Sequence, residues 1–158
     1  MKIIGTAALL LVSTTAMSAC SGASGRLSHT QLVDRANAIC RAAGRPYAGD
    51  RPTQPAQFLD FLKAQVPAEQ NGLKALEAVR PPKAEQSAWS SQIIAPEREQ
   101  LADVTAAVAA LQDAIGRRDR PGASVLVQQT TDRLDQRGAG INAYWKANGM
   151  DACLDSPL

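Results

Sequence analysis

The sequence predicts an all-α fold, a four-helix bundle with a short first helix. Apolar residues recur at intervals of three and four along four segments, which is the period of amphipathic helices. Proline and glycine residues separate these segments. No segment alternates apolar and polar residues for long enough to predict a strand. Aromatic residues make up only 4% of the chain while alanine is abundant, a balance that favours closely packed helices.

The first helix is expected to begin after Ser28, because Ser28 and Gln31 have the spacing of a capping box. Gly44 is expected to end it, and residues 45–54 form a loop. Its apolar stripe comprises Leu32, Ala36, Ile39, Cys40 and Ala43.

The second helix is expected to start near Thr53, the proposed N-cap, with Pro55 in its first turn. Pro67 interrupts the pattern and predicts a kink, and Pro81-Pro82 ends the helix. Its stripe comprises Phe58, Leu62, Val66, Leu73, Leu76 and Val79.

A third helix is predicted over residues 83–116, with a second kink at Pro96. The fourth runs from about Pro121 to Asn148, and Gly149 follows as a C′ residue. Trp89 and Trp145 fall on the apolar stripes and are expected in the core. The other stripe residues are Ile93, Leu101, Val104, Val108, Leu111 and Ile115 in the third helix, and Leu126, Thr130, Leu134 and Ile141 in the fourth.

Residues 1–19 predict a signal peptide for export. Lys2 precedes an apolar stretch, Ile3 to Val12, and small residues follow. The stretch is much shorter than the roughly 20 residues that span a bilayer. The expected organisation is a signal peptide at 1–19, a lipidated cysteine and tether at 20–27, and a helical domain at 28–158.

The residues Met17-Ser18-Ala19-Cys20 resemble the bacterial lipobox, whose usual form is Leu, a small residue, Gly or Ala, then Cys. Met17 departs from the usual Leu. The resemblance implies a diacylglycerol on the Cys20 thiol, cleavage before it, and a protein anchored outside the cytoplasm on the cell membrane. The alternative is an ordinary signal peptide that leaves Cys20 as a free thiol.

With Cys20 acylated, Cys40 and Cys153 remain, and in an exported protein two such cysteines are expected to form a disulfide. The alternative is that Cys40 is a small core residue. In a plain up-down bundle the ends of the first and last helices lie far apart, so pairing predicts that these helices run in the same direction. Residues 44–54 would then cross the bundle, and eleven extended residues reach about 36 Å.

The chain also resembles a group of small bacterial lipoproteins common among actinobacteria. The similarity lies in Ala38-Ile39-Cys40, the double proline Pro81-Pro82, Trp89, and the late Asn148, Gly149 and Cys153. Met150 stands where those proteins often have Leu. The resemblance implies the helical fold, the anchor and the disulfide, and no activity.

Several chemistries are excluded or disfavoured by composition. Removal of Lys2 with the signal leaves 16 Lys plus Arg against 15 Asp plus Glu, so no bulk field attracts nucleic acid. His29 is the only histidine and is expected to cap or face solvent, so no haem, di-iron or zinc site and no cofactor is predicted. Gly138-Ala139-Gly140 lacks the context of a phosphate loop.

The acidic residues along the helices are interpreted as solvated faces. They are Asp60, Glu69, Glu77, Glu97, Glu99, Asp103 and Asp132. Arg117, Arg118 and Arg120 cluster between the third and fourth helices and complement the helix dipole there. In the crossover topology they would share an end with the tether, and we hypothesise that they contact anionic lipid headgroups.

No recognisable catalytic set is present, so the sequence predicts a non-enzymatic module that binds a protein partner or a small apolar ligand. The alternatives are a structural protein of the cell envelope, and a hydrolase that uses paired carboxylates.

Overall fold

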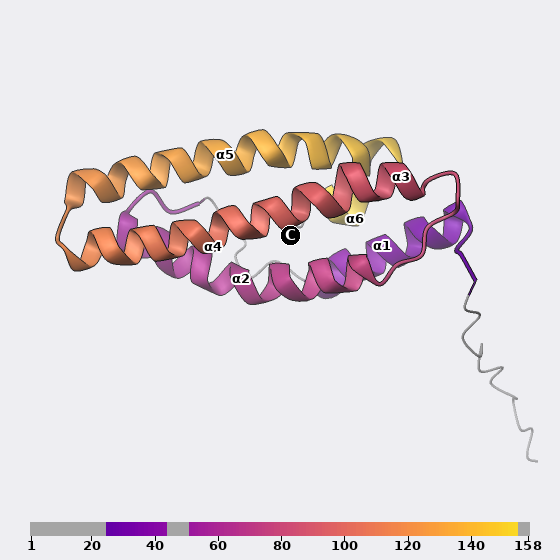
Figure 1. The fold of residues 1–158 in the computed structure, drawn as a ribbon, viewed down its shortest axis with the longest axis horizontal. Coiled ribbons are helices and arrows are strands. Elements are labelled where there is room, and N and C mark those ends of the chain that lie inside the picture. The colour runs from indigo at the N-terminus through magenta and orange to yellow at the C-terminus, as the bar shows by residue number, and fades with distance from the viewer. Residues whose placement is uncertain (1–24, 44–50, 155–158) are drawn as a thin grey trace, which may run out of the picture.

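A computed structural model describes residues 25–43 and 51–154 (Figure 1). The predicted signal peptide and Cys20 lie outside these residues. Within them the chain is helical without strands, which confirms the predicted all-α bundle. The long helices are α1 (His29–Ala43), α2 (Pro55–Glu77), α4 (Ala95–Gly116) and α5 (Arg120–Ala147). The short ones are α3 (Gln86–Trp89), the π-helix η1 (Ser90–Ile94) and α6 (Asp151–Leu154).

The start of α1 confirms the predicted capping box. The Ser28 backbone N–H donates to Gln31 Oε1 at 2.9 Å, and the Gln31 N–H donates to Ser28 Oγ at 3.3 Å. These reciprocal bonds satisfy two backbone donors that a helix N-terminus leaves free, and they fix where α1 begins.

The prolines shape α2 and the start of α4. Pro55 is the first residue of α2, so its N-cap is Gln54, which makes no side-chain capping bond; the prediction of Thr53 was wrong. Pro67 lies inside α2, with helix on both sides. Pro96 follows η1, and because proline lacks an N–H, the wider π-helical turn accommodates the missing helical bond.

The turn between α4 and α5 is closed by Asp119, whose carboxylate accepts a 2.9 Å hydrogen bond from the Gly122 N–H. A Cβ atom on Gly122 would lie 2.2 Å from Asp119 Oδ2, so only glycine allows this tight cap. The chain therefore reverses within four residues, and α5 lies antiparallel along α4 (Figure 1).

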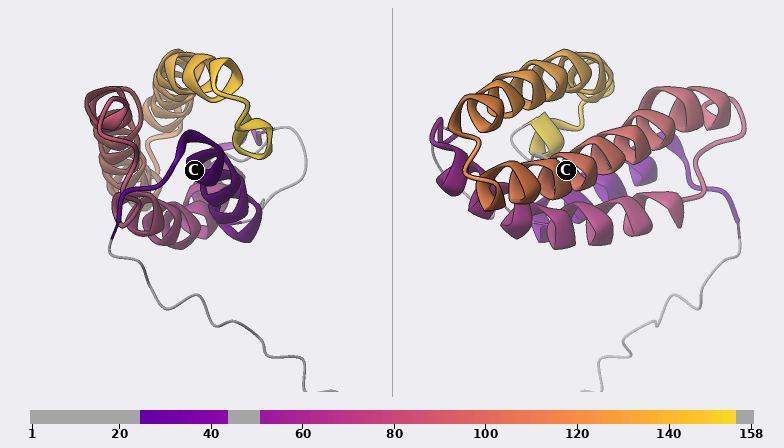
Figure 2. Two further views of the ribbon diagram at one scale, coloured as in Figure 1. Left: turned by 90° about the vertical axis from the view of Figure 1, so that its right-hand side faces the viewer. Right: turned by 60° about the vertical axis from the view of Figure 1, so that its left-hand side comes forward.

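The four long helices alternate in direction around the bundle (Figure 2). The start of α1 is joined to the α2–α3 connection: the Leu27 N–H donates to the Arg80 carbonyl at 2.9 Å, and His29 Nδ1 lies 3.1 Å from a Glu85 carboxylate oxygen. That connection is at the opposite end of the bundle from the α4–α5 turn (Figure 1). The prediction that the first and last helices run in the same direction was therefore wrong.

The chain instead brings the cysteines together by folding back after α5. Gly149 has φ of 70°, a conformation that glycine adopts without strain. The Met150 N–H then donates to the Trp145 carbonyl at 2.9 Å, and α6 returns along α1. The Cys40–Cys153 disulfide is present, with the two Cα atoms 5.1 Å apart.

Asn37 on α1 reinforces this return. Its side-chain oxygen accepts a 3.0 Å bond from the Ala152 N–H, and its amide nitrogen donates to the Gly149 carbonyl at 3.5 Å. Two side-chain bonds and one disulfide thus attach the last described turn of chain to α1.

The core consists of two apolar clusters. One is built from α1, α3, η1, α6 and the C-terminal parts of α2 and α5, with Trp89 packed edge-to-face on Trp145 at a centroid distance of 5.9 Å. Both tryptophans are buried, as predicted. The second cluster contains residues of α2, α4 and α5 and none of α1. The described helices therefore form a four-helix half and a three-helix half.

We expect the Cys40→Ser, Cys153→Ser double variant to lose about 2–5 kcal/mol of unfolding free energy, because the bond closes a loop of more than 100 residues. Urea unfolding with and without a phosphine reductant measures the change. Reductant should destabilise the wild-type protein and leave the double variant unaffected. Equal midpoints for oxidised and reduced wild-type protein would contradict this account of α6.

Candidate functional site

A polar layer separates the two apolar clusters. Gln65 and Glu69 face the interior from α2, and Glu97 and Gln100 face it from α4; each is at most 8% exposed. Along α2 the two polar residues lie between Leu62 of one cluster and Leu76 of the other. Glutamates are almost never fully buried unless paired, so this layer is the most unusual feature of the core.

The interpretation of the acidic residues as solvated faces was wrong for Glu69 and Glu97. Glu69 lies seven residues after Leu62 and seven before Leu76, in phase with the buried stripe. Glu97 is likewise four residues after Ile93. The spacing of both residues therefore indicates a buried position, whereas their charged residue type indicates an exposed one.

Other acidic residues do lie at the surface in ion pairs. Glu77 pairs with Arg98 at 2.6 Å. Arg137 on α5 bridges to Asp103 at 2.8 Å and also contacts Glu99, which joins α5 to α4. These arginines form ion pairs outside the core, and none of these pairs involves the buried Glu69 or Glu97.

Burial raises the pKa of Glu69 to about 7. Burial also raises the pKa of Glu97 to about 8, with a further contribution from the negative charge of Glu69. One Glu69 oxygen, Oε2, has no hydrogen-bond partner among the described residues. At neutral pH the pair therefore retains at least part of its protons, since two adjacent carboxylates in an apolar interior repel each other and lack solvation.

A groove runs along α1, and we call it the α1–α2 groove. Its first part, about 530 Å³, lies between α1 and the chain that follows α2. Its floor and walls include Leu27, Ala38, Ala78 and Val79. The volume is within the range of about 300–1,000 Å³ that small-molecule sites occupy.

The α1–α2 groove continues past Ala38 into a smaller hollow of about 280 Å³ between the end of α1 and α2. Small residues line this part, including Ala42, Ala75 and Gly72. Arg35 lines both parts, and Arg80 lines the first. The groove thus combines an apolar, small-residue surface with two cationic side chains and one acidic side chain, Asp34. Neither part is lined by Glu69 or Glu97.

The predicted surface residues lie at opposite ends of the molecule. His29 is about half exposed, as predicted for a residue that faces solvent, and it pairs with Glu85. Arg117 pairs with Asp113 at 3.1 Å in the α4–α5 turn, beside Arg118 and Arg120. The headgroup hypothesis required this turn to share an end with the start of α1, and that premise is wrong.

Within the described ranges no three His, Cys, Asp or Glu side chains are grouped as a metal site would need. None of the described helices has both the length and the apolar character of a membrane span.

Fold and site together define a disulfide-closed helical bundle with a divided core, a buried carboxyl pair and an apolar groove. No family model, curated protein or solved structure matches the chain.

We expect the free energy of unfolding to fall as the pH rises from about 5 to about 8. The unfolded glutamates titrate near 4.5 and the folded ones near 7 and 8, so the folded state binds more protons in this window. Each excess proton costs about 1.4 kcal/mol of stability per pH unit. Urea midpoints at several pH values measure the slope.

A variant carrying Glu69→Gln and Glu97→Gln should lose this pH dependence and be more stable than the wild type at pH 8, since glutamine resembles a protonated glutamate in size. Asp60→Asn, at an exposed position of α2, is the matched control and should keep the wild-type slope. A wild-type stability that stays level or rises over this pH range would refute the buried pair.

Proposed function

We propose that the protein is a lipid-anchored module on the extracytoplasmic side of the cell membrane, and that it binds a small amphipathic ligand in the α1–α2 groove. The single observation that carries the binding proposal is this groove, with its apolar floor and its two arginines. An apolar site with a few placed polar groups is the usual form of a ligand pocket.

The anchor and the export route rest on the residues around Cys20. The Cys40–Cys153 disulfide supports export, because such bonds persist in oxidising compartments. The disulfide also stabilises the bundle against unfolding, which suits a protein that works outside the cytoplasm without chaperones.

The charged residues that line the groove are two arginines and one aspartate, Asp34, and this net positive charge favours an anionic ligand with an apolar body. Arg35 and Arg80 offer charge-assisted hydrogen bonds to a carboxylate or phosphate, while Leu27, Ala38 and Val79 offer apolar contact. This ligand class refines the small apolar ligand expected from the sequence.

A carboxylate-dependent hydrolase is the weaker candidate. The Glu69–Glu97 pair, with one pKa near 7 and the other near 8, is the observation in its favour. Catalysis also needs a path for substrate, and the groove residues do not include these glutamates.

Filling the α1–α2 groove tests the binding proposal. We expect 1-anilinonaphthalene-8-sulfonate, an anionic apolar probe, to bind the wild-type protein with enhanced fluorescence. Ala38→Phe should weaken binding by about tenfold or more, a loss of about 1.4 kcal/mol, because the phenyl ring occupies the centre of the groove.

Ala109→Phe adds the same ring at an exposed position of α4 away from the groove and serves as the control. It should bind the probe like the wild type. Equal probe affinity in both variants, with unchanged melting temperatures, would show that the groove is not the binding site.

A further inference from the structure

The end of the bundle from which the N-terminal segment leaves carries a group of basic side chains. We call it the tether end; it comprises residues 25–28 and the α2–α3 connection, residues 78–85. The Arg26 guanidinium donates to the Pro81 carbonyl at 3.3 Å, and the Leu27 N–H donates to the Arg80 carbonyl at 2.9 Å. The first described residues are therefore fixed to the connection between α2 and α3.

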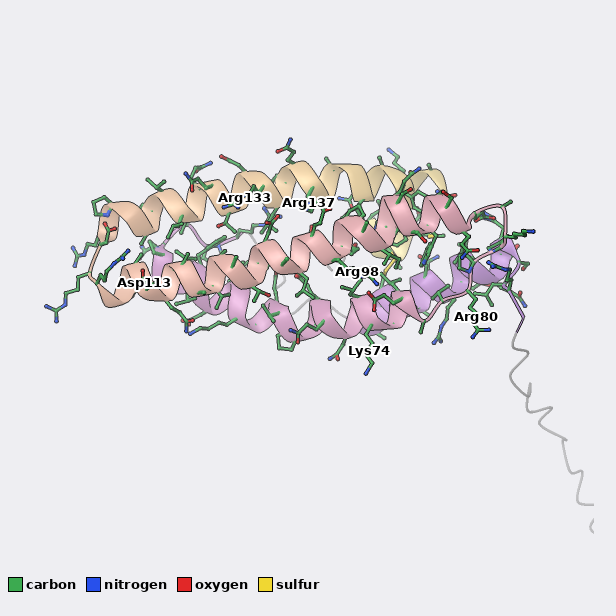
Figure 3. The ribbon with its side chains drawn as sticks, in the orientation of Figure 1. Lys74, Arg80, Arg98, Asp113, Arg133 and Arg137 are labelled. Carbon is green, nitrogen blue, oxygen red and sulfur yellow. A yellow bond between two sulfur atoms is a disulfide. The ribbon has the colours of Figure 1, made fainter. Side chains whose placement is uncertain are left out.

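Three basic residues of the tether end are exposed: Arg26, Arg80 and Lys83. Figure 3 shows Arg80 pointing outward close to the start of the described chain, with Asp113 far away toward the other end. Within the tether end, Glu85 is the acidic residue, and it already pairs with His29. The charge presented here is therefore net positive.

The chain length to Cys20 fixes how far this end can lie from an anchored lipid. Gly25 is five residues from Cys20, and five extended residues reach at most about 18 Å. The α4–α5 turn is farther from the anchored lipid than the tether end is. The difference is the length of residues 86–116, which is about 46 Å of helix. Electrostatic attraction at physiological salt decays over about 8 Å, so only the tether end can feel a charged surface strongly.

We propose that the tether end docks on the anionic phospholipids of the membrane that holds the anchor, through Arg26, Arg80 and Lys83. This inference rests on the proposed acylation of Cys20 for its geometry. The docked bundle stands on its tether end, with the α4–α5 turn pointing away from the bilayer. The α1–α2 groove begins at the tether end, between Leu27 and Arg80, so it opens close to the lipid surface.

The test uses the chain from residue 20 onward with Cys20→Ser, so that the protein charge alone drives binding. Sedimentation with phosphatidylcholine vesicles, with and without phosphatidylglycerol, gives the partition coefficient. We expect phosphatidylglycerol to raise it by about 100-fold, the combined effect of three basic residues near an anionic surface, and added salt to abolish the gain.

The triple variant Arg26→Gln, Arg80→Gln, Lys83→Gln should lose this gain. The matched control, Arg117→Gln, Arg118→Gln, Arg120→Gln, removes the same charge at the opposite end and should change the partition coefficient by less than about threefold. Lys83→Glu alone, at an exposed site, should weaken binding by more than tenfold. This single variant keeps the test valid if the triple variant does not fold.

Binding that does not depend on phosphatidylglycerol, or that falls equally in both triple variants, overturns the proposal.

The intact mass of the natively produced protein tests the anchor separately. A mass that lacks residues 1–19 and includes a diacylglycerol supports the proposed anchor. A chain without lipid overturns the anchor, whatever the vesicles show for the charged surface.

Discussion

The four-helix half of the bundle depends on the covalent link between α1 and the chain that folds back after α5. α1 ends at Ala43, close to Gly72 in the C-terminal part of α2, and contributes to one apolar cluster alone. Cys153 reaches Cys40 because Gly149 reverses the chain and α6 returns by a single helical turn. The fourth side of the bundle is thus built from α1 and the single turn of α6, joined by a disulfide.

The polar layer lies where this four-helix half gives way to the three-helix half. Glu69 and Glu97 are placed between the clusters, and their burial costs stability that well-packed apolar residues would not cost. Such a cost is expected to persist only where it serves a purpose other than stability. The raised pKa of each carboxyl makes the centre of the bundle sensitive to proton concentration near neutrality.

Local features were predictable because they depend on neighbouring residues. The capping box at Ser28, the place of Pro55 in the first turn of α2 and the C′ position of Gly149 each follow from backbone chemistry within one turn. The burial of Trp89 and Trp145 was predictable because both residues fall on the apolar stripe of their helices. The direction of α1 could not be predicted in the same way. Paired cysteines need Cα atoms about 4.4–6.8 Å apart, which suggests parallel helices if both cysteines lie at helix ends. The chain reversal before α6 meets this distance with antiparallel helices, and so short a helix has no apolar periodicity that would predict it.

The candidate site was predictable only in part. The groove depends on how α1 and α2 pack, which residue spacing within one helix does not specify. The buried glutamates could have been located by phase alone, since both lie in register with Leu62 or Ile93. The topology also changes which basic residues lie near the N-terminal end of the described chain. They are Arg26, Arg80 and Lys83, and not Arg117, Arg118 and Arg120.

Pulsed electron paramagnetic resonance with nitroxide labels tests this topology most directly, in the chain from residue 20 with Cys20→Ser and its disulfide intact. Labels at Thr30 and Ala84 should lie within about 20 Å, whereas labels at Thr30 and Arg118 should be separated by about 45 Å, the length of α3, η1 and α4. A long first distance and a short second one would contradict the antiparallel placement of α1, and with it the proposal that the tether end faces the membrane.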